Sequence, residues 1–248
     1  MLAIIGGTGL NQLNGITELE ILKPQTKLGP PSGPIYKGIY NGQEICFLAR
    51  HGAPHHIPPH LINYRANILA LDELGVTKII AVNAVGGISD HLGPANLAIP
   101  DQIIDYTIAR DNTYFDGIFQ PLDHIDFTFP YDETLRCALL SASRRIGLDI
   151  MDGGTYAATQ GPRLESAAEV ERIRRDGGSM IGMTGMPEAA LARELGLSYC
   201  CIALSVNWAA GVKGCSEISM QDIRKALELG MQQVLRLIEA YLQTQKNI

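Results

Sequence analysis

The sequence has few of the features that mark membrane, secreted or nucleic-acid-binding proteins. No apolar run approaches the ~20 residues of a membrane span, and the short run at residues 2–5 lacks the basic start of a secretory signal. The five cysteines are odd in number and show no C-x-x-C spacing, which is typical of free thiols in a reducing compartment. Acidic residues outnumber basic ones by 26 to 20, which disfavours nucleic acid or an anionic membrane as the main partner. We therefore expect a cytoplasmic protein.

The chain also lacks a linker, an internal repeat and a low-complexity tract. With 248 residues, of which 46% are hydrophobic, it is long enough for one large core, so one α/β domain is expected. Strand-like runs alternate with amphipathic helical patterns. The strand-like runs are residues 35–40, 44–49, 78–82, 102–105, 156–159, 180–183 and 198–206, and the helical patterns are residues 63–74, 132–146, 165–175, 188–195 and a last helix starting at Ser219.

Three glycine-rich segments follow buried strand-like runs in the first third of the chain. They are residues 6–9 (GGTG), 50–52 (RHG) and 83–87 (NAVGG), and each is expected to be a loop at the carboxyl end of a strand. Backbone N–H groups at glycine, the Thr8 hydroxyl and the Arg50 guanidinium suit an anion. Any one segment alone is typical of a plain strand-to-helix connection. The three together predict one composite anion site.

Two common nucleotide-binding motifs do not explain these glycines. Gly7-Thr8-Gly9 begins the pattern G-x-G-x-x-G, but position 12 is Gln, and no Lys-Ser/Thr pair follows as in a P-loop. His51 shares a proline-rich loop with three further histidines but with no cysteine, so we expect no metal site there. We interpret His51 alone as functional.

Two later segments carry polar groups beside apolar runs. Glu165 is expected to open the helix at 165–175, where a carboxylate is favoured by the helix dipole. Asn207 ends the run at 198–206 and precedes the only tryptophan, Trp208. An asparagine after a strand is often only a turn former. From these residues alone, a structural role and a binding role both remain open.

Six motifs together resemble the trimeric purine nucleoside phosphorylase and methylthioadenosine phosphorylase family. In chain order they are IIGGTG (4–9), ARHG (49–52), NYRAN (63–67), NAVGG (83–87), GPR (161–163) and GMTGMPE (182–188). The resemblance implies one phosphorylase domain over residues 1–248, with a central mixed, partly barrel-like β-sheet flanked by helices. It further implies a homotrimer, inorganic phosphate as co-substrate, and no other cofactor.

The resemblance also implies a role for individual residues. Met183 matches the residue beside the ribose, Met220 matches the 5' end of the nucleoside, and His124 matches a residue reaching that end from an adjacent subunit. Trp208 is also expected to be a substrate-binding residue. The phosphate site falls on Thr8, Arg50, His51, Asn83, Ala84 and Thr184, and the purine pocket on Leu164, Glu165, Asn207 and Ala209.

Three pocket positions favour hypoxanthine over adenine. Adenine-specific relatives carry Asp where Asn207 and Ala209 stand, and these accept from the 6-amino group and supply a proton to N7. Asn207 can instead hold N7–H and donate to a 6-oxo group. Glu165 matches the carboxylate with which 6-oxopurine phosphorylases accept from N1–H.

The 5' end favours a methylthio group. Phosphorylases of ordinary nucleosides place a His near the 5'-hydroxyl, whereas Met220 is apolar and polarisable. A core position at the start of an amphipathic helix is the structural alternative for Met220. Burying a hydroxyl without a partner costs about 1 to 3 kcal/mol, so a pocket of this kind disfavours inosine.

The combination predicts phosphorolysis of S-methyl-5'-thioinosine to hypoxanthine and 5-methylthioribose 1-phosphate, a purine salvage reaction. Bound phosphate attacks C1' through a transition state like an oxocarbenium ion, and Asn207 acts in catalysis by stabilising the base as N7 gains its proton. One alternative is an S-methyl-5'-thioadenosine phosphorylase that releases adenine, and another is an inosine or guanosine phosphorylase. A non-catalytic nucleoside- or dye-binding protein on the same scaffold is the alternative from another class.

Overall fold

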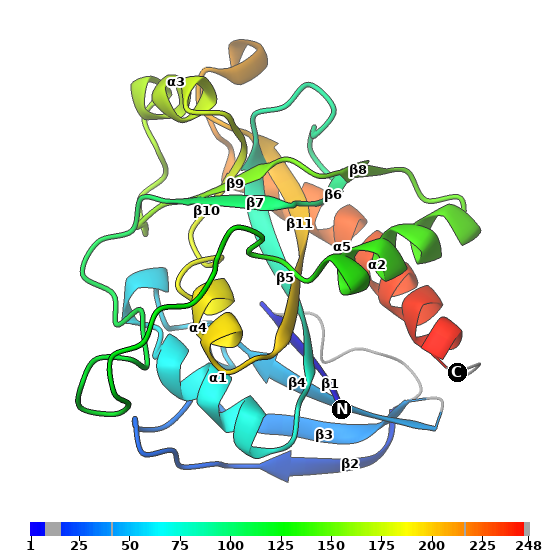
Figure 1. Ribbon diagram of the computed structural model, residues 1–248. Helices are drawn as coiled ribbons and strands as arrows, with labels where there is room; N and C mark the ends of the chain where they lie inside the picture. Colours follow the sequence, from blue (N-terminus) through cyan, green and yellow to red (C-terminus); the bar gives the residue numbers. More distant parts are fainter. Residues whose placement is uncertain (8–15, 41, 216, 246–248) are drawn as a thin grey trace.

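A mixed β-sheet forms the centre of the molecule (Figure 1). The computed structural model describes residues 1–7, 16–40, 42–215 and 217–245, and within them the sheet has 11 strands. One path through it runs β2-β3-β4-β1-β5-β10-β9-β7, and β11 pairs with β5 and leads through β6 to β8. The strands are β1 (Leu2–Gly6), β2 (Ile16–Leu22), β3 (Ile35–Tyr40), β4 (Gln43–Ala49), β5 (Lys78–Gly87), β6 (Leu97–Ile99), β7 (Gln102–Asp105), β8 (Ile150–Asp152), β9 (Thr155–Ala158), β10 (Gly178–Gly182) and β11 (Ser198–Trp208).

Helices cover two opposite sides of this sheet. Figure 1 shows α2 and α5 together on one side and α1 and α4 together on the other. No described helix is both long and apolar enough to cross a membrane. The described α-helices are α1 (Tyr64–Glu73), α2 (Glu133–Arg145), α3 (Ala167–Arg175), α4 (Glu188–Glu194) and α5 (Met220–Thr244), and short 3-10 turns are formed by Pro59–Leu61 and Val212–Gly214.

The side chains of a strand alternate between the two sides of the sheet, and here both sides are buried. In β1, Ile4 packs in the cluster with α2 and α5, whereas Ile5 packs in the cluster with α1 and α4. Neighbouring residues of β11 divide in the same way, with Cys200 in the first cluster and Cys201 in the second. This explains why the central strands are continuously apolar rather than alternating with polar residues.

Four of the five described α-helices start after a capping side chain, and α4 is the exception. Ser219 caps α5 by accepting from the Asp222 N–H, as its position predicts. At α3 the cap is Ser166, which exchanges side-chain and backbone hydrogen bonds with Glu169 in a capping box. The predicted helix start at Glu165 is therefore wrong. Glu165 lies outside the helix, in the segment between β9 and α3.

The two longest strands extend beyond their predicted ends at residues 82 and 206. β5 continues through residues 83–87, and β11 continues through 207–208. The two extensions pair with each other, with Asn207 opposite Gly86. The register shifts between Ser205 and Asn207, which is a β-bulge. A bulge re-aims a side chain next to a site, and here it fixes where the Asn207 amide lies.

The expected fold class, a single α/β domain whose mixed sheet is flanked by helices, is confirmed. β2, β6 and β8 are additional strands that the sequence patterns do not predict. β2 is mostly exposed at one edge of the sheet, while β6 and β8 are short.

Candidate active site

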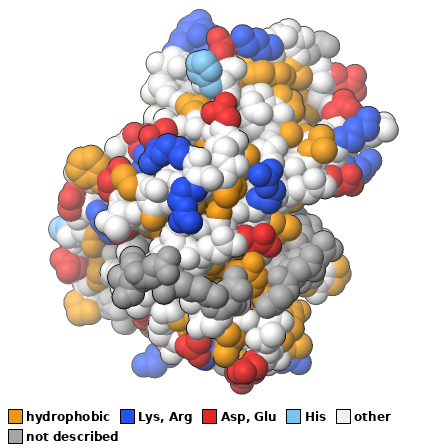
Figure 2. All heavy atoms as spheres, turned by 90° about the vertical axis from the view of Figure 1, so that its right-hand side faces the viewer, with side chains coloured by type: hydrophobic (Ala, Val, Ile, Leu, Met, Phe, Trp, Pro, Cys, Tyr) orange, Lys and Arg blue, Asp and Glu red, His pale blue; other side chains and the backbone are white. Residues whose placement is uncertain are grey.

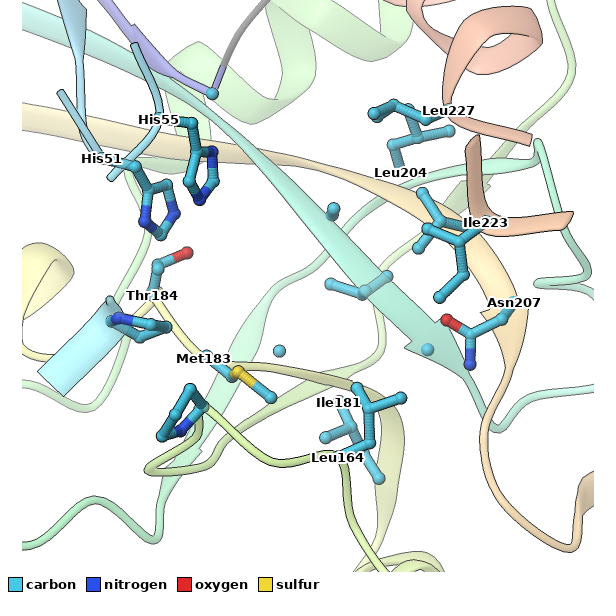
Figure 3. A pocket seen from close by; sticks show the side chains of 18 of the residues that line it. His51, His55, Leu164, Ile181, Met183, Thr184, Leu204, Asn207, Ile223 and Leu227 are labelled. Carbon is cyan, nitrogen blue, oxygen red and sulfur yellow. The ribbon is translucent and has the colours of Figure 1, made fainter. Parts of the chain in front are cut away.

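A cavity of about 590 Å³ lies where the carboxyl halves of β5 and β11 meet the loop after β4 and the first half of α5. Figure 3 shows His51 and Thr184 at one end of it and Asn207, Ile223 and Leu227 at the other, with Met183 between the two ends. Most of the residues predicted to bind substrate line this cavity. They are Arg50, His51, Ala84, Leu164, Glu165, Met183, Thr184, Asn207, Ala209 and Met220.

Three of the predicted residues do not line the cavity, and a fourth is not described. Thr8 lies outside the described residues. Asn83 is buried beside the cavity and does not line it. The Trp208 indole lies against Gly93 and is not on the cavity wall. His124 is exposed in the segment between β7 and α2, away from the cavity of its own chain.

Arg50 is held at the cavity by a buried carboxylate. Its Nε and Nη2 donate to the two Glu188 carboxylate oxygens at 2.7 Å each, and Nη1 donates to the Val82 carbonyl at 3.1 Å. Burial by itself lowers the pKa of Arg50, but the charge and hydrogen bonds of Glu188 outweigh it and raise that pKa. Two of the five guanidinium N–H groups remain for an anion. Because Glu188 offsets the charge, this end of the cavity offers fixed donors more than net positive charge.

Thr184 supplies a hydroxyl whose orientation is set by a hydrogen bond from Asn83. The Asn83 amide donates to Thr184 Oγ1 at 2.7 Å, and Asn83 Oδ1 accepts from the Cys201 thiol at 3.4 Å. Since Thr184 Oγ1 already accepts one bond, its O–H is left to donate. Asn83 thus acts on the cavity through Thr184.

His51 is a neutral side chain at this end. Its Nδ1 lies 2.9 Å from the Ile57 carbonyl, which can only accept, so Nδ1 carries the proton and Nε2 is an acceptor. Burial lowers the His51 pKa to about 4, and the nearby Arg50 and His55 lower it as well. The His51 ring stacks on His55 with ring centres 4.2 Å apart. His51 therefore contributes a hydrogen-bond acceptor rather than positive charge.

Asn207 lies at the opposite end of the cavity from His51 (Figure 3). Its Nδ2 donates to the Trp208 carbonyl at 2.7 Å. This bond identifies which amide atom is the nitrogen, because the Trp208 carbonyl can only accept and its partner must therefore be the donating NH2 group. The amide therefore keeps Oδ1 and one N–H for a ligand. Ala209, which is buried beside it on the cavity wall, brings no carboxylate of its own.

Glu165 also lines the cavity, from the segment before α3. The Thr159 hydroxyl donates to Glu165 Oε1 at 2.6 Å, which fixes the carboxylate and occupies one of its oxygens. The other oxygen can accept a hydrogen bond from a ligand. Glu165 and Asn207 thus offer acceptors from two sides of the cavity, and Asn207 adds a donor.

The first half of α5 forms an apolar wall that the motifs do not reveal. Met220, Ile223, Leu227 and Met231 all line the cavity, at the three- and four-residue spacing of one helix face. Met220 is 59% exposed, so it lies on the cavity wall and not in the core. The helical spacing of these residues is the signal in the sequence that identifies the wall.

One face of the molecule shows charges of both signs. On the face seen in Figure 2, Lys and Arg side chains are interspersed with Asp and Glu. Among the residues that the structure describes, no group of three or more His, Cys, Asp or Glu side chains is arranged to hold a metal ion. The donors that suit an anion are those inside the cavity.

Comparison with known protein families identifies this architecture. The model of the phosphorylase superfamily matches residues 1–243. The chain belongs to the phosphorylase superfamily. The family predicted from the six motifs is thereby confirmed.

Individual relatives within the superfamily differ in name. A probable S-methyl-5'-thioinosine phosphorylase of Pseudomonas syringae pv. tomato is 52% identical over 94% of both chains. A 6-oxopurine nucleoside phosphorylase of Pyrococcus furiosus is 42% identical over 96% of this chain and 91% of the other. Among solved structures, a methylthioadenosine phosphorylase from an Antarctic soil metagenomic library superposes with a TM-score of 0.92 at 34% identity, covering 98% of this chain and 85% of that one.

Proposed function

We propose that this protein is a purine nucleoside phosphorylase of the pentosyltransferase type that cleaves S-methyl-5'-thioinosine with phosphate. The products are hypoxanthine and 5-methylthioribose 1-phosphate. Relatives about 50% identical carry the name of this activity. Within the structure, the proposal rests on one observation: an oxopurine-compatible pair, Glu165 and Asn207, shares a cavity with the apolar face of α5.

Phosphate is proposed to bind at the end of the cavity near Arg50. The two free N–H groups of Arg50 and the Thr184 hydroxyl are donors, and Thr8 and the Ala84 backbone N–H are proposed to complete the set. A phosphate dianion carries one O–H group, which His51 Nε2 can accept. Holding the nucleophile beside C1' removes the entropic cost of bringing two substrates together.

The leaving base is proposed to be stabilised at the other end. As the C1'–N9 bond breaks, negative charge accumulates on the purine, and a proton from solvent on N7 relieves it. The phosphate dianion gives up its own O–H proton when it becomes the sugar ester, so the proton count is balanced. Asn207 Oδ1 is the acceptor for N7–H, and the remaining amide N–H donates to O6. Glu165 accepts from N1–H of the 6-oxo form. Met183, between the two ends, is proposed to contact the ribose, and Leu164 to contact the base.

The cavity fits adenine less well. Adenine has an unprotonated N1, which would face the Glu165 carboxylate, and its 6-amino group would face the Asn207 N–H rather than an acceptor. A site built to hydrogen-bond one partner rejects an analogue that leaves buried polar groups unpaired. The S-methyl-5'-thioadenosine alternative is therefore second. Because a solved structure with 34% identity is a methylthioadenosine phosphorylase, S-methyl-5'-thioadenosine is included among the substrates to be tested.

The 5' end is proposed to hold the methylthio group against Met220, Ile223 and Leu227. A 5'-hydroxyl at this wall would lose hydrogen bonds to water without replacement. His124 is proposed to reach this end from an adjacent subunit of a homotrimer. Trp208, whose indole lies against Gly93, is proposed to act only through the backbone carbonyl that holds Asn207.

We also propose a cytoplasmic location and one catalytic domain over the whole chain. All five cysteines are free thiols, which fits a reducing compartment. The proposed reaction needs phosphate as co-substrate and no metal ion.

The test is a product analysis. The purified protein is incubated with S-methyl-5'-thioinosine, with and without phosphate, and the products are resolved by chromatography and phosphorus NMR. We expect hypoxanthine and a sugar 1-phosphate in equal amounts, and only when phosphate is present. Hypoxanthine release that is independent of phosphate would indicate a hydrolase and contradict the proposal.

A further inference from the structure

Arg110 joins two loops of the active site without lining the cavity itself. It lies in the segment after β7, and its Nη2 donates to the carbonyls of Thr159 at 3.2 Å and Gln160 at 2.9 Å. Its Nε also donates to Gln160 Oε1 at 3.3 Å. All of these acceptors belong to the segment that leads from β9 toward α3.

The same guanidinium reaches a second loop, which follows β10. Nη1 donates to the carbonyls of Met183 at 2.8 Å and Met186 at 2.6 Å. It also donates to the Tyr64 hydroxyl at 3.2 Å, and the guanidinium lies over the Tyr64 ring, 5.5 Å from its centre. The five N–H groups of one side chain thus serve six uncharged oxygens, with one N–H of Nη1 shared between two acceptors.

Each loop carries part of the proposed substrate site. In the first, the Thr159 hydroxyl fixes Glu165, and Pro162 and Leu164 line the cavity. In the second, Met183 and Thr184 line the cavity, and the two carbonyls that bind Arg110 lie on either side of Thr184. Arg110 therefore contacts the loop of the base pocket and the loop of the phosphate end at once.

The charge of Arg110 explains how the two loops stay together. Four backbone carbonyls point at one place, and the negative ends of their dipoles repel one another. A guanidinium provides donors in a fixed plane and a positive charge that offsets this repulsion. An ammonium group is a point charge with three donors, so a lysine here cannot serve all the acceptors.

We propose that Arg110 is a positioning residue that sets the distance between the purine pocket and the phosphate end. This inference rests on the proposed function for the identity of the two ligands. If Arg110 sets that distance, its loss weakens the binding of both hypoxanthine and phosphate. A defect confined to either loop would weaken only one of them.

The experiment measures hypoxanthine and inorganic phosphate binding separately by calorimetry, together with turnover of S-methyl-5'-thioinosine. Arg110→Ala and Arg110→Lys are compared with Thr184→Val, which tests the phosphate end, and Glu165→Gln, which tests the base pocket. Arg193→Ala is the matched control, since Arg193 also donates to two loop carbonyls, those of Asp126 and Phe129, but not to the cavity loops.

For Arg110→Ala we expect both dissociation constants to rise about tenfold and kcat to fall about a hundredfold, the loss typical of misplacing reacting groups by about 1 Å. Arg110→Lys should recover only part of this loss. Added guanidinium ion should restore activity to Arg110→Ala, and methylammonium should not. Thr184→Val should weaken phosphate alone and Glu165→Gln hypoxanthine alone, while Arg193→Ala should match the wild type.

The inference is overturned if folded Arg110→Ala binds both ligands as the wild type does, or if only one is weakened. It is also overturned if guanidinium ion restores neither binding nor turnover. A wild type that binds both ligands but does not release hypoxanthine would contradict the proposed function instead. In that case, the binding of the two ligands to the variants still decides the role of Arg110.

Discussion

Arg50 and Glu188 lie 138 positions apart in the chain and meet as a bidentate ion pair with both side chains buried. The Tyr199 hydroxyl donates to the same carboxylate at 2.9 Å, so Glu188 is bound from two sides. The pair fixes the guanidinium that the sequence assigns to phosphate. It also means that the charge at this end of the cavity is largely compensated.

Glu188→Gln should destabilise the protein strongly, because it leaves the buried Arg50 charge without a counter-charge. Breaking one partner of a buried pair typically costs about 3 to 5 kcal/mol. The measurement is the free energy of unfolding in urea, with Glu171→Gln as control. Glu171 pairs with Arg174 and Arg175 on the surface, where solvent screens the charges, so its loss should change the unfolding free energy little. Equal small effects of both substitutions would refute this reading of the buried pair.

Asn207→Asp combined with Ala209→Asp should move the base preference toward adenine. The two carboxylates would supply acceptors for the 6-amino group and a proton donor for N7, as in the adenine-specific relatives. We expect the ratio of kcat/KM for S-methyl-5'-thioinosine to that for S-methyl-5'-thioadenosine to fall by at least about a hundredfold. An unchanged ratio in a folded, active variant would show that the base is selected by other residues.

Ile223→Thr should reduce the preference for a methylthio group over a hydroxyl. The substitution places a hydroxyl on the wall formed by α5 and keeps the β-branched shape. Because apolar pockets discriminate modestly, we expect a change of roughly tenfold in the ratio of kcat/KM for S-methyl-5'-thioinosine and inosine. Leu229→Thr is the control, since Leu229 is an exposed residue of the same helix that does not line the cavity. An equal change in the control would argue against the wall.

His51 should make stability depend on pH in a defined window. Its pKa is lowered to about 4, below the 6.5 of an unperturbed histidine, so the unfolded chain binds more protons between these values. The stabilisation is present above pH 6.5 and is lost as pH falls toward 4. The unfolding free energy of His51→Asn relative to wild type should therefore be constant above pH 7 and shift in favour of the variant below 6.5. A difference that does not vary across this range would contradict the assigned protonation state.

Much of the sheet could be predicted from the sequence, and the exceptions share a cause. The continuous apolar runs of β1, β4 and β11 predict buried strands because both faces of the sheet are covered. Residues 83–87 and 207–208 contain glycine and asparagine, which locally favour turns. They are strands because each provides the hydrogen-bonding partner of the other, and a pairing across more than 100 residues leaves no local signal.

The candidate site was predictable where a motif carries it. Arg50, Thr184 and Glu165 line the cavity as the family resemblance implies. The contacts that hold them were not predictable, because those of Glu188 to Arg50 and Arg110 to Met183 join residues far apart in the chain. The sequence favours Glu165 at the helix start because a first-turn carboxylate suits the dipole, but Ser166 and Glu169 form the cap instead.

The most direct test of the account is the relative kcat/KM of three nucleosides at saturating phosphate: S-methyl-5'-thioinosine, S-methyl-5'-thioadenosine and inosine. The account predicts the highest value for S-methyl-5'-thioinosine, because Glu165 and Asn207 suit a 6-oxopurine and the α5 wall suits the methylthio group. A higher kcat/KM for S-methyl-5'-thioadenosine would contradict the assigned base pocket, and a higher value for inosine would contradict the assigned 5' wall.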